Sequence, residues 1–275
     1  MGATEALRQA SLDEVDIAAS LALSAAVGWN QTAEDWRIFL AAGNAIGLFD
    51  AGDRLVATAA TLPYGADFGW ISMVIVAPAW RRQGLAQRLM RECIARLEGA
   101  GRAALLDATP AGAAVYAGLG FAALTEMERW EGEGVRGAAD PRVGTADLDA
   151  LVAADAAAFG TDRRFLLGDF LARDGGAALT CDDAYLVMRR GLRATQLGPL
   201  IARSPAPAER LLAAAIGMTT GPIFLDLFAG WSRLGAFLAA KGFRRQRPFR
   251  RMALGRSDLP GDAARLALAA GPEFG

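Results

Sequence analysis

The 275-residue sequence contains no histidine, and this absence narrows the chemistry open to the chain. Imidazole is the usual general base of nucleophilic triads and the commonest metal ligand. Triads, general bases and metal sites that depend on histidine are therefore excluded. The two cysteines, Cys93 and Cys181, have no metal-ligand spacing either, so we expect no metal and interpret both as buried thiols.

Charge imbalance and long apolar runs are lacking as well. The formal net charge is −1 and lysine occurs only as Lys241, so nothing in the composition favours nucleic acid or an anionic membrane as a partner. No stretch has the pattern of a leader or of a bilayer-spanning segment. We expect a soluble cytoplasmic protein, a monomer or a homodimer, with enough apolar residues for two domains.

The most informative segment that is present runs from Val74 to Met90. It is typical of a strand, a basic turn and a helix start in succession, because Pro78 ends the strand and Gly84 and Ala86 stand where the helix begins. The first amides of a helix have no internal acceptor and carry the positive end of its dipole. The segment therefore predicts an anion site, although a solvated surface turn would have the same residues.

This segment resembles the pyrophosphate-binding signature of the GNAT superfamily of N-acetyltransferases. A strand ending in Val-x-Pro, here Val76-Ala77-Pro78, is followed by Arg81-Arg82-Gln83-Gly84-Leu85-Ala86. Apolar residues at helical spacing continue the pattern from Leu85 to Leu97 and favour a helix that packs on a core. The resemblance implies that acetyl-CoA is the co-substrate. The residues that it implies as the cofactor site are Val74, Val76, Arg81, Arg82, Gln83, Gly84, Leu85 and Ala86.

A second signature of the same superfamily follows at Leu106–Gly112 and Val115–Phe121. Its tyrosine, here Tyr116, precedes Gly120-Phe121 by one helical turn. By resemblance Tyr116 is the catalytic residue that protonates the departing thiolate of coenzyme A. Without that context an amphipathic tyrosine would be interpreted as a packing residue.

The pattern of elements is repeated along the chain and predicts an α/β (α+β) fold of two tandem GNAT domains. Each domain should have a mixed, splayed central sheet flanked by helices, over residues 1–134 and 135–275. In the second repeat, Pro205 and Pro207 stand where the first has the Gly-containing turn of the pyrophosphate-binding signature, and Leu238 stands where the first has the tyrosine. The resemblance is therefore to a bacterial tandem-GNAT protein with an intact first domain and a degenerate second, which has a structural role or helps to form the acceptor site.

The function implied is acetyl transfer from acetyl-CoA to a primary amine of a small molecule or peptide by direct attack. The acceptor would bind at Trp29, Asn30 and Gln31, in the connection between the first two helices, although these could also be core and loop residues. The general base is open, and Asp67, Asp107, Glu126 and Glu128 are candidates acting through water. A non-enzymatic acyl-CoA-binding or sensing protein is the alternative.

Local signals predict the start of the chain in more detail. We expect a strand over residues 6–10, a helix capped by Ser11, and a second helix capped by Thr32, with Asp35 completing a capping box. Three strands should then follow at residues 45–49, 55–62 and 69–76.

Overall fold

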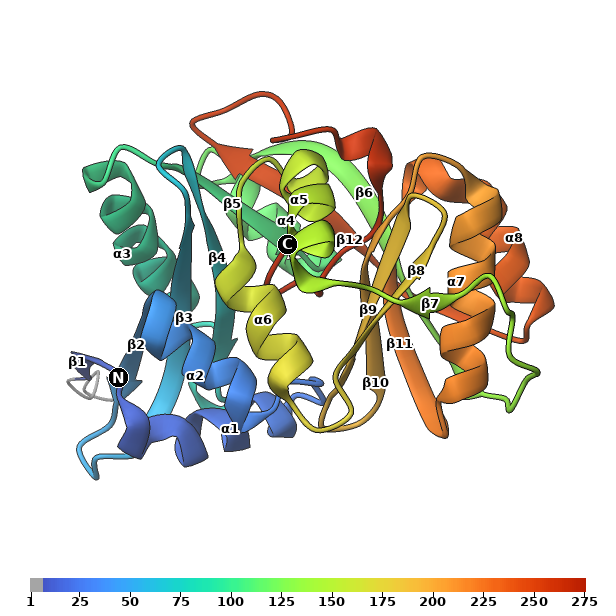
Figure 1. Ribbon diagram of the computed structural model, residues 1–275. Coiled ribbons are helices and arrows are strands. Elements are labelled where there is room, and N and C mark those ends of the chain that lie inside the picture. Colours follow the sequence, from blue (N-terminus) through green and yellow to red (C-terminus); the bar gives the residue numbers. More distant parts are fainter. Residues whose placement is uncertain (1–6) are drawn as a thin grey trace. The chain divides into compact units, whose positions relative to one another are not determined.

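The computed structural model describes residues 7–275, and the chain forms two compact units, Met1–Leu105 and Leu106–Gly275 (Figure 1). Each unit is defined by its own packing. The sequence repeats predicted at 1–134 and 135–275 are defined by pattern instead, and as functional domains they stay a prediction. No helix within residues 7–275 is long and apolar enough to cross a bilayer.

The first unit is a sheet covered by helices. Its strands are β1 (Arg8–Ser11), β2 (Asn44–Phe49), β3 (Leu55–Tyr64), β4 (Phe68–Val76) and the beginning of β5 (Ala103–Ala108). Its helices are η1 (Glu14–Asp16), α1 (Ile17–Ala26), α2 (Ala33–Ala42), η2 (Pro78–Trp80) and α3 (Leu85–Gly99). Strands β1 to β4 form an antiparallel meander, and β5 joins β4 in parallel after the crossover through α3.

The helix starts show where local sequence signals hold. Thr32 begins α2 with the predicted capping box, in which its backbone amide donates to Asp35 Oδ2 at 2.9 Å. The prediction for Ser11 is wrong, because Ser11 pairs with Ile46 as the last residue of β1. Asp13 caps η1 instead, accepting from the Val15 amide at 2.9 Å. Of the strand expected at residues 6–10, residue 6 lies outside the described residues.

The core of the first unit confirms the predicted apolar face of α3. Its buried side chains are Leu85, Leu89, Met90, Cys93, Ile94 and Leu97. They pack on β3 and β4, and Gly69 of β4 has no side chain where Leu97 approaches. Trp36 and Phe39 of α2 are buried in the same unit. Burial of these residues fixes the start of α3 at the end of β4.

The second unit is a larger mixed sheet. Its strands are β6 (Ala122–Gly134), β7 (Gly144–Thr145), β8 (Ala177–Cys181), β9 (Ala184–Arg190), β10 (Thr195–Ile201), β11 (Gly221–Phe228), β12 (Arg244–Leu254) and β13 (Leu266–Leu268). Its helices are α4 (Pro110–Ala117), α5 (Leu148–Phe159), α6 (Arg164–Ala172), α7 (Pro205–Met218), η3 (Ala229–Trp231), α8 (Ser232–Ala240) and η4 (Ala263–Arg265). The strand order is β12-β6-β11-β13-β10-β9-β8-β7. Helices α5 and α6 lie on one side of β8–β11, and α7 and α8 on the other (Figure 1).

Strands β6 and β12 are exchanged between the two sequence repeats. Strand β6 belongs to the first repeat but lies between β12 and β11 of the second, antiparallel to both. Its Arg129 donates two hydrogen bonds to Asp226 of β11, at 2.9 and 2.8 Å. Arg251 of β12 binds Asp107, at the end of β5, in the same bidentate way, at 2.9 Å for both bonds. Each repeat thus supplies an arginine to the aspartate of the other.

Candidate functional site

Strand β4 has an open edge in the part that the cofactor signature predicts. It pairs with β5 at only three positions, Phe68–Trp70 with Ala103–Leu105. Over the rest of β4, β3 is its only ladder partner within the described part of this unit. Val74 and Val76 are half-buried there. Their strand therefore offers backbone groups to an extended ligand.

A bulge interrupts β4 within this open stretch. The register with β3 shifts between Thr58 and Ala60, and Met73 has a φ of 54°, which is rare for a large side chain. The Thr58 hydroxyl donates to the Met73 carbonyl at 2.8 Å and holds the bulge. Bulges redirect the backbone groups of a strand. This one changes the direction of the amides next to Met73, and it could not be predicted because no glycine marks the position.

The N-terminus of α3 has the predicted anion-binding form. Gly84 is its N-cap, with a φ of 76°, and no side chain caps the first turn. A Cβ on Gly84 would meet no atom within 4 Å. The amides at the start of the helix are therefore open to an exogenous acceptor, and they carry the positive end of the α3 dipole.

Two arginines and a glutamine precede this helix on an exposed turn. Arg81, Arg82 and Gln83 are all exposed, and Arg82 has a φ of 62°. Arg81 Nε donates to the Val76 carbonyl at 3.1 Å, which fixes the turn against the end of β4. The remaining guanidinium groups can bind a phosphate in bidentate fashion. Of the predicted cofactor residues, Leu85 is buried and Ala86 half-buried, and at the start of the helix both have backbone amides without an intrahelical acceptor.

The predicted acceptor residues lie at the α1–α2 connection of the first unit. Trp29 is half-buried, whereas Asn30 and Gln31 are 6% and 5% exposed. Gln31 Oε1 is buried and has no hydrogen-bond partner, and the same holds for Ser72 Oγ on β4. Buried polar atoms without partners are uncommon and are expected where a ligand supplies the missing bond. The only signal for Ser72 in the sequence is that its neighbours in the strand are apolar.

Tyr116 lies in the second unit, on α4. Thr109 caps this helix by accepting from the Gly112 amide at 3.3 Å. The Tyr116 ring is half-buried and packs against Phe121 with a centroid separation of 6.3 Å. The packing that an amphipathic tyrosine would show is thus present. Its proposed catalytic role rests on the motif.

Three of the four carboxylates considered as general bases are engaged in ion pairs. Burial raises the pKa of Asp107 although Arg251 opposes the shift, and both carboxylate oxygens accept from that arginine. Glu126 pairs with Arg250, and Glu128 with Arg245. The fourth, Asp67, is exposed. A carboxylate whose oxygens already hold a guanidinium is a poor proton acceptor, so the geometry does not single out a base.

The second repeat has the same parallel strand pair, but the space between its strands is filled. Strands β10 and β11 pair at three positions, Thr195–Leu197 with Ile223–Leu225. Beyond them β13 pairs with both: Leu268 lies opposite Leu200 of β10 and Leu227 of β11. A Cβ on Gly198 would collide with the Ala269 carbonyl, so glycine is required there. Helix α7 begins at Pro205, which has no amide to donate.

Buried ion pairs hold the segment that contains β13. Leu266–Gly275 is buried except for Pro272. Arg189 donates to the Ala270 carbonyl at 2.7 Å and to Glu273 at 2.6 Å. Arg163 binds Asp155 through two hydrogen bonds and donates to the Gly275 carbonyl at 2.8 Å. The chain therefore occupies, with its own backbone, the opening that the first repeat leaves along β4.

Comparison with known proteins agrees with this architecture. Residues 35–123 and 151–267 each match a sequence family described as an acetyltransferase (GNAT) domain. The chain therefore belongs to the GNAT superfamily of acetyltransferases and contains two GNAT domains in tandem. This confirms the family and the fold class predicted from the sequence.

Several solved structures have the same fold along most of their length. A candidate acetyltransferase from Pyrococcus horikoshii is 18% identical, with a TM-score of 0.86 over 100% of this chain and 98% of that one. A GCN5-related N-acetyltransferase from Sphaerobacter thermophilus is 15% identical, with a TM-score of 0.63 over 93% and 96%. A tandem GNAT protein from the clavulanic acid biosynthesis pathway is 15% identical, with a TM-score of 0.60 over 92% and 100%. At these identities the likeness is one of fold. No curated protein matches the sequence.

Proposed function

We propose that the protein transfers the acetyl group of acetyl-CoA to a primary amine of a small molecule or peptide, and that it binds one acetyl-CoA, in the domain 1–134. The observation that carries the proposal is the uncapped start of α3 at Gly84, which adjoins the open edge of β4 within one unit. A ligand with a diphosphate and an extended amide arm matches these two features. Acetyl-CoA has both groups.

The residues have distinct parts in this proposal. The amides of Gly84 to Ala86 bind the diphosphate together with Arg81, Arg82 and Gln83, and the backbone of Val74 and Val76 pairs with the amide arm. Trp29, Asn30 and Gln31 bind the acceptor. The amine nitrogen forms a bond to the acetyl carbon, the carbon–sulfur bond breaks, and Tyr116 protonates the departing thiolate. The proton lost by the amine passes to water or to a carboxylate.

The chain offers a matched pair of glycines to test the binding site. Gly84 and Gly101 flank α3 and have φ values of 76° and 70°, and a Cβ on either glycine would meet no atom within 4 Å. Gly84→Asp and Gly101→Asp therefore add the same strain and the same charge to the same unit. Only Gly84→Asp places a carboxylate at the proposed diphosphate site. Isothermal titration should give one acetyl-CoA per parent chain, an unchanged affinity for Gly101→Asp, and no measurable binding for Gly84→Asp.

Two outcomes contradict the proposal. If folded Gly84→Asp binds acetyl-CoA like Gly101→Asp, the diphosphate does not lie at α3. If the parent binds two equivalents, the second repeat has a cofactor site despite β13.

A binding protein without transfer activity is the second candidate. It is favoured by the ion pairs of Asp107, Glu126 and Glu128, which occupy the carboxylates that a base would need. Release of free coenzyme A across a panel of primary amines distinguishes the two functions. Transfer to any amine that is lost in Tyr116→Phe supports the enzyme, whereas binding without release over the whole panel supports the sensor.

We further propose that residues 135–275 support the first domain and help to form the acceptor site, without a transfer of their own. The exchange of β6 and β12 supports this role, because each repeat completes the sheet of the other. The filled space between β10 and β11 supports the absence of a second transfer site.

A further inference from the structure

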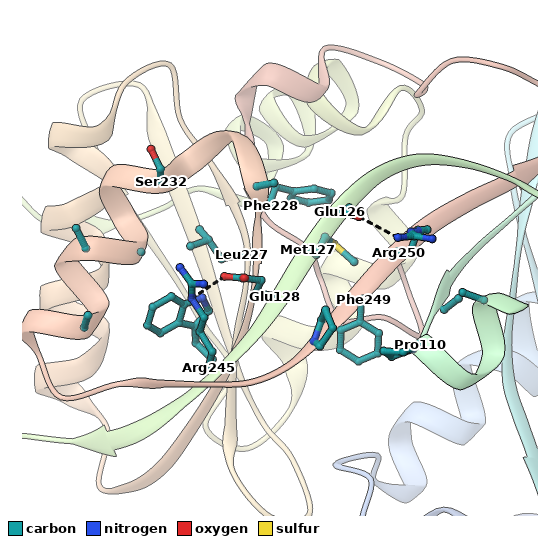
Figure 2. Close-up of a pocket in the computed structure, with 18 residues that line it drawn as sticks. Pro110, Glu126, Met127, Glu128, Leu227, Phe228, Ser232, Arg245, Phe249 and Arg250 are labelled. Atoms are coloured by element: carbon teal, nitrogen blue, oxygen red, sulfur yellow. Dashed lines mark hydrogen bonds and ion pairs between the residues drawn. The ribbon is translucent and has the colours of Figure 1, made fainter.

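The second unit contains a cavity of about 730 Å³ that the proposed function does not use. Its floor is formed by the exchanged strands β6 and β12, and its walls by α4 and α8, with the end of β11 (Figure 2). None of the predicted cofactor or acceptor residues, nor Tyr116, belongs to its lining. Its volume is in the range of sites for small organic ligands.

The lining of the cavity is mainly apolar. Met127, Phe228 and Phe249 project into it from three different strands (Figure 2). The helices that form its walls present small side chains, among them Ala113 of α4 and Ala236 of α8. These small residues leave space for a ring-sized body between the two helices, which larger residues would fill.

One polar group of the lining lacks a partner. The Trp130 indole lies in the cavity wall next to Gly235 and is 4% exposed, and its Nε1 is buried with no hydrogen-bond acceptor. The Arg245 guanidinium lies 5.3 Å from the Trp130 ring centroid. An indole N–H is a donor only, and a buried donor without an acceptor is unfavourable. A ligand oxygen that reaches this group as the lining adjusts removes that disadvantage.

The charged groups at the cavity are balanced among themselves. Glu128 pairs with Arg245 at 3.0 Å, and Glu126 with Arg250 at 3.1 Å, each pair joining β6 to β12 (Figure 2). Both arginines are exposed and keep further donors, because a guanidinium has five N–H groups. The carboxylates, in contrast, already hold a cation. The groups that an anion can use are therefore the Trp130 N–H and the remaining N–H groups of these arginines.

We propose that this cavity binds a small organic anion with an aromatic or similarly sized apolar body. The body lies between α4 and α8 against Phe228 and Phe249. The anionic oxygens accept from Trp130 Nε1 and from Arg245. The cavity shares no residue with the proposed cofactor and acceptor sites, and of the carboxylates considered as bases only the ion-paired Glu126 and Glu128 line it, so its occupancy can be measured without any activity.

Two fluorescent probes test the proposal on the full chain. One equivalent of the anion 8-anilinonaphthalene-1-sulfonate should bind per chain, as measured by the fluorescence of the probe excited at its own absorption band. Ala236→Leu fills the cavity and should weaken binding at least tenfold. Ala240→Leu is the matched control, because Ala240 is an exposed alanine of α8 outside the lining, and it should leave the affinity unchanged.

The indole is tested separately from the cavity. Trp130→Phe keeps an aromatic ring and removes the N–H, so it should lower the affinity for the anionic probe about tenfold. The neutral analogue N-phenyl-1-naphthylamine, which lacks the sulfonate, should bind Trp130→Phe and the parent alike. Circular dichroism establishes that each variant is folded. Absence of probe binding, equal binding by Ala236→Leu and the parent, displacement of the probe by acetyl-CoA, or an equal effect of Trp130→Phe on both probes would overturn the proposal.

Discussion

Replacing Asp226 with asparagine should be among the most destabilising single changes in this protein. Asp226 is fully buried and accepts three hydrogen bonds, two from Arg129 and one from Gln196 at 3.0 Å. Burial disfavours the charged form of Arg129, but the charge of Asp226 and its hydrogen bonds raise the pKa of Arg129 overall. When the carboxylate is lost, burial lowers the pKa of Arg129, but a guanidinium titrates so far above neutral pH that the arginine stays charged.

The size of the effect follows from the burial of both groups. Removing one partner of a buried ion pair leaves an uncompensated charge and costs about 3–5 kcal/mol. The pair Glu126–Arg250 also holds β6 to a neighbouring strand, in this case β12, but its side chains are 65% and 49% exposed. Exposed pairs contribute about 0–1 kcal/mol, so Glu126→Gln is the matched control.

Urea denaturation measures the difference. With a urea m value of about 3 kcal/mol/M, Asp226→Asn should lower the midpoint by about 1–1.7 M, and Glu126→Gln by less than about 0.3 M. The double variant Arg129→Met/Asp226→Leu should recover part of the loss, because it removes both charges of this pair and leaves neither uncompensated. An Asp226→Asn midpoint within 0.3 M (roughly 1 kcal/mol) of the parent would refute the reasoning.

Three further predictions concern catalysis, titration and assembly. Tyr116→Phe keeps the ring packed on Phe121 but removes the hydroxyl, so kcat should fall about a hundredfold with acetyl-CoA affinity unchanged. If the variant turned over at the rate of the parent, Tyr116 would not be the proton donor. Burial raises the pKa of Cys93 from 9.0 to about 12, so in the native protein it should not react with Ellman's reagent at pH 8. The thiol of the unfolded chain titrates at the lower pH, so the stability that Cys93 contributes is complete below pH 9 and is lost as the pH rises towards 12. Cys93→Ala should therefore reduce the fall of the unfolding free energy with pH in this range, and an unchanged fall would contradict the prediction. Fragments 1–134 and 135–275 should each lack cooperative unfolding when alone, and the refolded mixture should unfold cooperatively. Cooperative unfolding of the fragment 1–134 alone would contradict the inference that each repeat needs the strand supplied by the other.

Local chemistry made much of the first unit predictable. The capping box of Thr32 depends on residues three apart, and the buried face of α3 repeats at helical spacing, so neither needs knowledge of distant residues. The uncapped helix start at Gly84 was predictable for the same reason, since the strand end, the turn and the helix start follow one another directly in the sequence. The prediction at Ser11 was wrong, because a serine followed closely by two acidic residues fits a helix cap as well as a strand end. The pairing of Ser11 with Ile46 in the sheet decided between the two.

The exchanged strands could not be predicted from local pattern. The alternation of Glu126, Met127, Glu128 and Arg129 indicates a strand, but it does not say which strand pairs with it. A signal was nevertheless present in the repeated Leu-Asp ends at Asp107 and Asp226. Two aspartates at equivalent buried positions each require a cation, and the arginines of the other repeat are available partners.

The filled space in the second repeat depends on a segment with little local signal. Strand β13 has only three residues, and a short apolar run is compatible with a helix or a strand. The sequence did show Pro205 and Leu238 at the positions that match the predicted cofactor and catalytic residues. It did not show that β13 would lie between β10 and β11. Gly198, which a side chain would force against Ala269, was the one marker of that close approach.

The exchange of β6 and β12 has a consequence for synthesis on the ribosome. Arg129 emerges 97 residues before Asp226, and Asp107 emerges 144 residues before Arg251. At translation rates of about 5–20 residues per second, β6 waits about 5–20 s with both edges unpaired. An unpaired edge can accept the matching strand of a neighbouring nascent chain in place of its own. Closely spaced ribosomes on the message should therefore increase the fraction of chains that exchange strands with a neighbour instead of folding singly.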